Sequence, residues 1–160
     1  MNSTRKILGK NKAVEMTVTL KVPDTTAITA LQTLHKIGFG KIKDVKRYDY
    51  YKFLIEGDEE KFRNSISKVD SLVNVNKHLF SFEIKKDDSV NVLVKNIDDS
   101  GVGILSILND RLGFSGIKKA EKAVLWSLSI DAQGSNAKKI AEKAAKELLA
   151  NENYQEYSII

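Results

Sequence analysis

Residues 145–160, AKELLANENYQEYSII, run in a helix-like pattern to Asn151 and then alternate in an extended pattern that includes Tyr157. Residues 67–84, SKVDSLVNVNKHLFSFEI, have the same arrangement around Asn74. Asn tolerates the left-handed backbone conformation better than most residues with a side chain. We therefore expect each Asn to end a helix in that conformation. Two such endings predict that the chain contains the same small unit twice.

The first unit begins with alternating apolar and polar side chains over residues 14–22, VEMTVTLKV, which predicts a half-buried strand. Asp24 supplies an N-capping oxygen for a helix that stops at Gly38. Two strands are expected near 42–48 and 51–56, then a helix capped by Asp58 and a last strand through 80–84. The apolar residues at helical spacing are Ile28, Leu31, Leu34 and Ile37 in the first helix, and Phe62, Ile66, Val69 and Leu72 in the second.

The second unit repeats this order from Val90. A strand over 90–96 precedes a helix within 98–112, a strand over 124–130, a helix over 135–150 and a last strand through Tyr157 and Ile159. Lys21 aligns with Lys95, Phe39 with Phe114 and Asn74 with Asn151, at shifts of 74, 75 and 77 residues.

The predicted fold class is therefore α+β, with two β-α-β-β-α-β units in tandem that pack as a pseudo-symmetric dimer. We expect antiparallel sheets with the helices on one face. The units cover 14–84 and 90–160. Residues 85–89 form a linker short enough for a hairpin between the flanking strands.

Charge and composition exclude several classes of function. The formal net charge is +5, but residues 1–13 carry four Lys and Arg residues and no acid, so the remaining 147 residues carry only +1. We expect 1–13 to be a flexible basic tail and the folded part to bind no nucleic acid. The chain contains no Cys and no apolar run that could span a membrane, so we expect a cytoplasmic protein with no membrane partner.

The sequence offers no catalytic, cofactor-binding or metal-binding constellation. His35 and His78 lack acidic or Cys partners at ligand spacing. The segments Gly38–Gly40 and Gly113–Gly116 follow helices, whereas an anion site would need them to open helices. We therefore expect no catalytic residue, no cofactor and no metal.

The polar and glycine-rich helix start after residue 97 provides the main site candidates. Asp98, Ser100, Gly101 and Gly103 are expected to shape this turn, with Asp99 or Ser100 as a helix cap in preference to a catalytic group. The glycines are expected to permit close approach of a partner or of another element. Further away, Asn151 ends a helix and Trp126 anchors either the core or an interface, with the core favoured.

The second unit resembles the PurS subunit of phosphoribosylformylglycinamidine synthase. The residues that carry this resemblance are Val94-Lys95, Asp98, Gly101, Leu112-Gly113-Phe114, Leu148-Leu149-Ala150-Asn151 and Glu156-Tyr157. The first unit is similar through Leu20-Lys21, Ile37-Gly38-Phe39 and Leu72-Val73-Asn74. The family usually has Pro where Asp99 stands, and the first unit has Pro23-Asp24-Thr25-Thr26 without Gly at this turn.

This resemblance implies a non-catalytic assembly subunit of a ligase complex in purine biosynthesis. Its implied partners are the ATP-dependent synthase subunit and the glutaminase subunit, and further self-association is left open. A fused pair would let each unit specialise towards a different partner. The main alternative is a tandem ACT-like module that senses a small ligand, because the two families share an element order and an acidic Gly turn. An enzyme with a cleft between the units is a third reading.

Overall fold

One six-stranded antiparallel sheet, in the order β3-β1-β2-β5-β4-β6, forms the centre of the computed structural model. The structure describes residues 11–84, 86–98 and 101–160, so the predicted tail is described only at 11–13. The strands are β1 (Lys12–Leu20), β2 (Ile42–Ile55), β3 (His78–Ser81), β4 (Val90–Asn96), β5 (Ile117–Ile130) and β6 (Gln155–Ile159). The predicted α+β class with antiparallel strands is confirmed.

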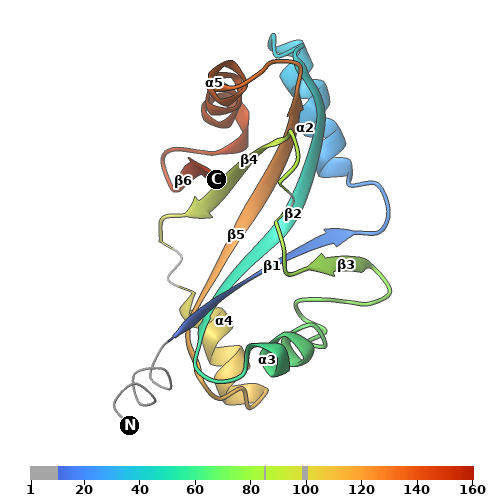
Figure 1. Ribbon diagram of the computed structural model, residues 1–160. Coiled ribbons are helices and arrows are strands. Elements are labelled where there is room, and N and C mark those ends of the chain that lie inside the picture. Colours follow the sequence, from blue (N-terminus) through green and yellow to red (C-terminus); the bar gives the residue numbers. More distant parts are fainter. Residues whose placement is uncertain (1–10, 85, 99–100) are drawn as a thin grey trace.

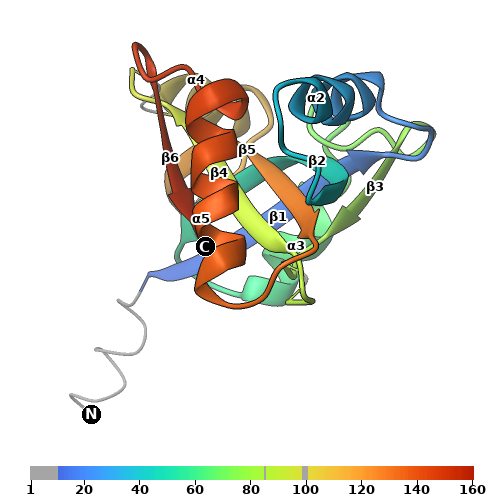
Figure 2. The same ribbon diagram turned by 90° about the horizontal axis from the view of Figure 1, so that it is seen from above.

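The helices follow the same order in both halves of the chain. They are α2 (Thr25–Lys36), α3 (Glu59–Ile66), α4 (Val102–Ser106) and α5 (Ser135–Ala144), of which the last two continue as the π-helices η1 (Ile107–Arg111) and η2 (Ala145–Leu149). Figure 1 shows α2 and α5 near one end of the long central strands and α3 and α4 near the other. Figure 2 views the first end from above, with α2 and α5 nearest the reader.

The two halves meet along the 14-residue strands β2 and β5. Strand β2 is continuous where the sequence predicts two shorter strands, because the apolar alternation runs on through Tyr51 and Phe53. Strand β5 begins at Ile117, earlier than the predicted strand over 124–130. Their pairing extends from Ile42 opposite Ile130 to Ile55 opposite Ile117. Since Ile42 and Ile55 correspond to Ile117 and Ile130 at a shift of 75, this register relates the two strands by an approximate twofold axis.

Two hydrophobic cores lie on the helix-bearing face of the sheet, and each contains residues from both halves. In the first core, Phe62 and Ile66 of α3 pack with Leu108 of η1. In the second core, Leu34 of α2 packs with Ala144 and Leu149 of the last helix. The prediction that helices cover one face is confirmed, and neither core is complete without both halves.

The predicted helix boundaries of the first half are mostly confirmed. Asp24 and Asp58 cap α2 and α3, each accepting hydrogen bonds from two first-turn amides. Gly38 ends α2 with φ +107°, and the N–H of Phe39 donates to the carbonyl of Leu34 at 2.9 Å. Helix α3 is shorter than predicted and ends at Ile66, although turns continue the chain to residue 73.

The left-handed conformation expected for Asn74 and Asn151 is wrong, since no described residue other than Gly has a positive φ. Each Asn instead forms a turn through its side chain. The oxygen of Asn74 accepts from the N–H two residues on at 3.0 Å, and that of Asn151 does the same at 3.1 Å. Their own N–H groups donate to the side chains of His78 and Gln155. The side-chain contacts pair backbone N–H groups at each turn without a left-handed backbone.

The expected hairpin between the halves is also wrong. Strands β1, β2 and β5 lie between β3 and β4, so the connecting segment must cross the sheet. Strand β3 ends at Ser81, and Phe82 and Ile84 do not continue it. Phe82 packs against the first core, whereas Ile84 packs on the opposite face against Tyr50, Ala123 and Leu125.

The inward face of α2 also differs from the prediction. Ile28 and Ile37 are 46% and 49% exposed, while Ala27, Ala30 and Leu34 are buried. Small residues let this helix lie close to the sheet and to η2. Leu112 is exposed as well, because the π-turn of η1 rotates the last residues of that helix away from the core.

Candidate functional site

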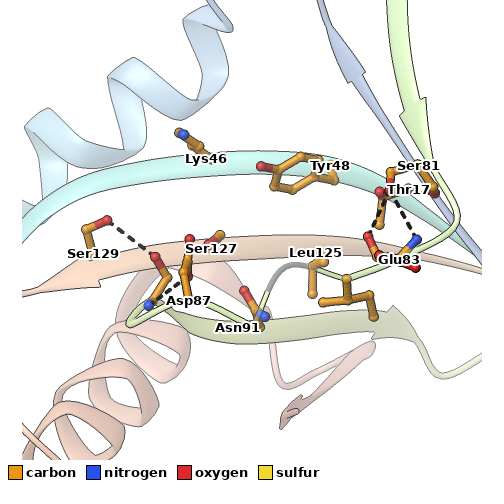
Figure 3. Close-up of a pocket in the computed structure, with 12 residues that line it drawn as sticks. Thr17, Lys46, Tyr48, Ser81, Glu83, Asp87, Asn91, Leu125, Ser127 and Ser129 are labelled. Atoms are coloured by element: carbon orange, nitrogen blue, oxygen red, sulfur yellow. Dashed lines mark hydrogen bonds between the residues drawn. The ribbon is translucent and has the colours of Figure 1, made fainter.

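The face of the sheet without helices carries a cavity of about 160 Å³ beside the crossing segment, of which the structure describes residues 82–84 and 86–89. Figure 3 shows Lys46 and Tyr48 on β2 and Asp87 on the crossing segment at its border. The lining residues are Thr17, Lys46, Tyr48, Ser81, Glu83, Ile84, Asp87, Ser89, Asn91, Leu125, Ser127 and Ser129. A wider groove on the other side of the segment is bordered by Glu15, Tyr50, Lys52 and Leu93.

Two polar residues with little exposure help to build this cavity. Thr17 of β1 and Asn91 of β4 are 6% and 8% exposed. Thr17 lies opposite Tyr50 of β2 and Asn91 opposite Ser127 of β5, so the two residues lie on opposite sides of the central strand pair. Thr17 Oγ1 donates to the carbonyl of Ser81 at 3.4 Å, and Ser89 and Ser129 place their hydroxyl oxygens 3.5 Å apart. These contacts hold both ends of the crossing segment against the sheet.

A tyrosine–carboxylate pair lies in the neighbouring groove. The Tyr50 hydroxyl donates to Glu15 Oε2. Burial raises the pKa of the Tyr50 phenol, and the hydrogen bond and charge of Glu15 raise it further. The phenol therefore stays protonated across the physiological range and acts as a donor. On the helix-bearing face, burial and the charge of Asp49 raise the pKa of Tyr51 to about 12.

An ion pair joins the start of α2 to the centre of the sheet. Arg47 Nε donates to Asp24 Oδ2 at 2.9 Å, and its Nη2 reaches Oδ1 at 3.3 Å. Burial alone would raise the pKa of Asp24, but the hydrogen bond and charge of Arg47, with the amides of Ala27 and Thr26, lower it below its ordinary value. Asp24 thus both caps a helix and anchors it to β2.

Replacement of Asp24 by Ala is expected to lower the free energy of unfolding by about 1–2 kcal/mol at pH 7, since it removes a helix cap and the partner of Arg47. Because folding lowers the pKa of Asp24, its stabilising contribution is present above the unfolded-state pKa and is lost as pH falls through the folded-state value. Urea unfolding of the wild type and Asp24→Ala at pH 7 and at pH 3 measures this. The difference between the two proteins should shrink at pH 3.

Asp58→Ala is the matched control, because Asp58 caps α3 through the same two amide contacts without an ion pair among the described residues. The excess effect at position 24 then measures the contribution of Arg47, up to about 1 kcal/mol. An Asp24→Ala effect that is equal at the two pH values would contradict this account of the ion pair.

The cavity and groove have the chemistry of a binding surface. Hydroxyl, amide, ammonium and carboxylate groups line them, and the described lining residues include no His or Cys. Within 11–84, 86–98 and 101–160, no group of three or more His, Cys, Asp or Glu is placed to hold a metal ion. His35 Nε2 lies 2.7 Å from the carbonyl of Ile42, and His78 Nδ1 accepts a backbone hydrogen bond.

Gly101 stands where close backbone approach requires a glycine. It precedes α4 with φ +74°, and a Cβ at this position would lie 1.6 Å from the carbonyl oxygen of Ala120 in β5. The sequence expectation of close approach thus holds for Gly101, and the approaching element is a strand of the same chain. A Cβ on Gly103 would meet nothing within 4 Å, so its role stays a prediction.

The other turn candidates do not gather around the cavity. Asp98 is exposed in the turn that follows β4, and Ser100 lies outside the described residues, as does Asp99. The helix begins at Val102 with Gly101 as its N-cap and no side-chain cap, later than the sequence predicts. Asn151 forms the side-chain turn after η2 and is exposed.

Trp126 lies in the core, as favoured from the sequence. It is 8% exposed and packs in the second core between the halves. Its ring borders a shallow groove with Thr25 and Thr29 of α2 and Leu148 of η2. Trp126 therefore joins the second half to the first.

Sequence reasoning missed the crossing segment, Thr17, Asn91 and the Asp24–Arg47 pair. The sequence does not single out Thr17 or Asn91, because both stand at alternating positions where a half-buried strand is expected to be exposed. Lys95 and Glu121 form a similar pair across β4 and β5 at 3.4 Å. Burial alone would raise the pKa of Glu121, but Lys95 and Lys119 lower it.

These features define an α+β protein in which the two halves share one sheet, with a polar cavity beside the sheet. Residues 89–160 match the PurS family model, described as phosphoribosylformylglycinamidine (FGAM) synthase, so the second half of the chain is similar to this family. The resemblance stated from the sequence is confirmed over this half. No curated protein matches the chain. Among the described helices, none has the length and apolar character needed to cross a membrane.

Proposed function

We propose that the chain is a fused pair of PurS-like units, 14–84 and 90–160, and serves as a non-catalytic assembly subunit of FGAM synthase. It bridges the ATP-dependent synthase subunit and the glutaminase subunit, so that ammonia released from glutamine is used by the synthase. A cytoplasmic location is part of this proposal.

The family match to residues 89–160 is the observation that carries the proposal. The fused pair is supported by the identical element order of the two halves, the twofold register of β2 and β5, and the matching side-chain turns at Asn74 and Asn151. A scaffold role is supported by side-chain chemistry suited to binding on the described surfaces.

The cavity beside the crossing segment supports a second candidate function. It is lined by groups of both charges and by hydroxyls, which suits a small polar molecule. A module that senses such a ligand, as in the ACT-like alternative, would use this cavity. Titration calorimetry with amino acids and nucleotides distinguishes the candidates, because a sensor must bind one of these compounds with saturation.

Reconstitution from purified subunits tests the bridging function. The synthase and glutaminase subunits from the same source are assayed for FGAM formation with glutamine or with ammonium, with and without this chain. We expect glutamine-dependent activity to need the chain and ammonium-dependent activity to persist without it. Co-migration of all three proteins on a sizing column is expected as well. Full glutamine-dependent activity without the chain would contradict the proposal.

A further inference from the structure

The outer edges of the sheet have opposite chemistry in the two halves. Strand β3 forms one edge and β6 the other. We define the apolar edge patch as the exposed residues Leu20, Val22, Val75, Leu79 and Phe80. Within it, Val75 is 62% exposed and Leu79 57%. Edge strands are normally protected by charged residues, yet β3 (HLFS) contains no Lys, Arg, Asp or Glu.

Backbone contacts show which residues of the second half correspond to this patch. The N–H of Lys21 donates to the carbonyl of Lys77 at 2.9 Å, and the N–H of Ile97 donates to that of Tyr154 at the same distance. Lys77 lies three residues after Asn74, and Tyr154 lies three residues after Asn151, the two residues that form the side-chain turns. This places Lys21 opposite Ile97, and Lys77 opposite Tyr154, in the comparison of the two edges. The alignment of Lys21 with Lys95 expected from the sequence is therefore wrong.

The correspondence reveals an exchange of apolar for acidic side chains. Val22, Val75 and Leu79 correspond to Asp98, Glu152 and Glu156, all exposed. Conversely, the exposed Lys21 and Lys77 correspond to the apolar Ile97 and Tyr154. The first edge is therefore apolar with a basic border, and the second is acidic. Lys21 Nζ donates to the carbonyl of Val75 at 2.6 Å, which keeps its charge beside the apolar edge patch.

We propose that the apolar edge patch docks one of the two partner subunits, and that this partner adds an apolar strand flanked by carboxylates to β3. Leu79 and Phe80 point to opposite faces of β3, so an added strand would contact apolar side chains on both faces. Carboxylates beside that strand would meet Lys21 and Lys77. The acidic β6 edge would repel the same partner, so each partner meets a different edge.

This inference rests on the proposed bridging function and is tested by binding to each purified subunit separately. The variant V75E/L79E introduces the acids found at the corresponding positions, and E152K/E156K alters the opposite edge. All four residues are exposed, so unchanged thermal unfolding shows that each variant folds. We expect V75E/L79E to weaken binding of one subunit by about a hundredfold, as for residues central to an interface. Binding of the other subunit should be unchanged.

One subunit is expected to depend on the apolar edge patch. The variant E152K/E156K should bind that subunit with the same affinity as the wild type. Wild-type affinity of V75E/L79E for both subunits, or equal loss of both, would overturn the inference while leaving the bridging function intact. Salt-sensitive polymerisation of the chain alone, abolished by either variant, would also overturn it, because the two edges would then bind each other. A wild-type chain that binds neither subunit would overturn both proposals.

Discussion

Gly101→Ala is expected to lower the free energy of unfolding by roughly 3 kcal/mol or more. The backbone at Gly101 has φ +74°, which costs a residue with a side chain about 1–2 kcal/mol. The new Cβ would also lie 1.6 Å from the carbonyl oxygen of Ala120, so helix α4 or strand β5 must move. Such overpacking adds about 1–3 kcal/mol. Denaturant unfolding at neutral pH measures the total.

Gly113→Ala is the matched control for this substitution. Gly113 has φ +69°, and a Cβ there would meet nothing within 4 Å. It should therefore cost only the conformational part, about 1–2 kcal/mol. The difference between the variants isolates the close approach of α4 to β5. Equal effects at the two positions would contradict the packing described for Gly101.

The second large effect is expected when the chain is cut within the crossing segment. Each hydrophobic core contains helices and strands from both halves, and the 14-residue strands β2 and β5 pair along their length. A separate half would expose Trp126 or Phe53, together with one edge of a central strand. A unit of about 70 residues buries a small fraction of its surface and is therefore only marginally stable, so it cannot lose much of its buried apolar area and stay folded. We therefore expect neither half to be stable as a folded monomer.

The features predicted well from the sequence are those set by local chemistry. Asp24 and Asp58 cap helices because a carboxylate oxygen can reach two free amides. Gly38 and Gly113 end helices with positive φ, as no other residue would do at low cost. Alternating apolar residues identify the strands because one face is buried.

The features that were not predicted depend on contacts between distant segments. The order of the six strands places the crossing segment over the sheet, whereas a linker of five residues is compatible with a hairpin as well. Ala27 and Ala30 are buried in place of Ile28 and Ile37 because helix α2 packs close to η2, which helical spacing alone does not indicate. Thr17 and Asn91 meet the same cavity only through that strand order.

A measurement on the divided chain tests the shared cores most directly. Residues 1–84 and 89–160 are produced separately and mixed, and each sample is examined by sedimentation and by thermal unfolding followed by circular dichroism. We expect that only the 1:1 complex of the two fragments recovers the far-ultraviolet spectrum and the cooperative unfolding transition of the intact chain. A monomer of either fragment with its own cooperative unfolding transition would contradict it.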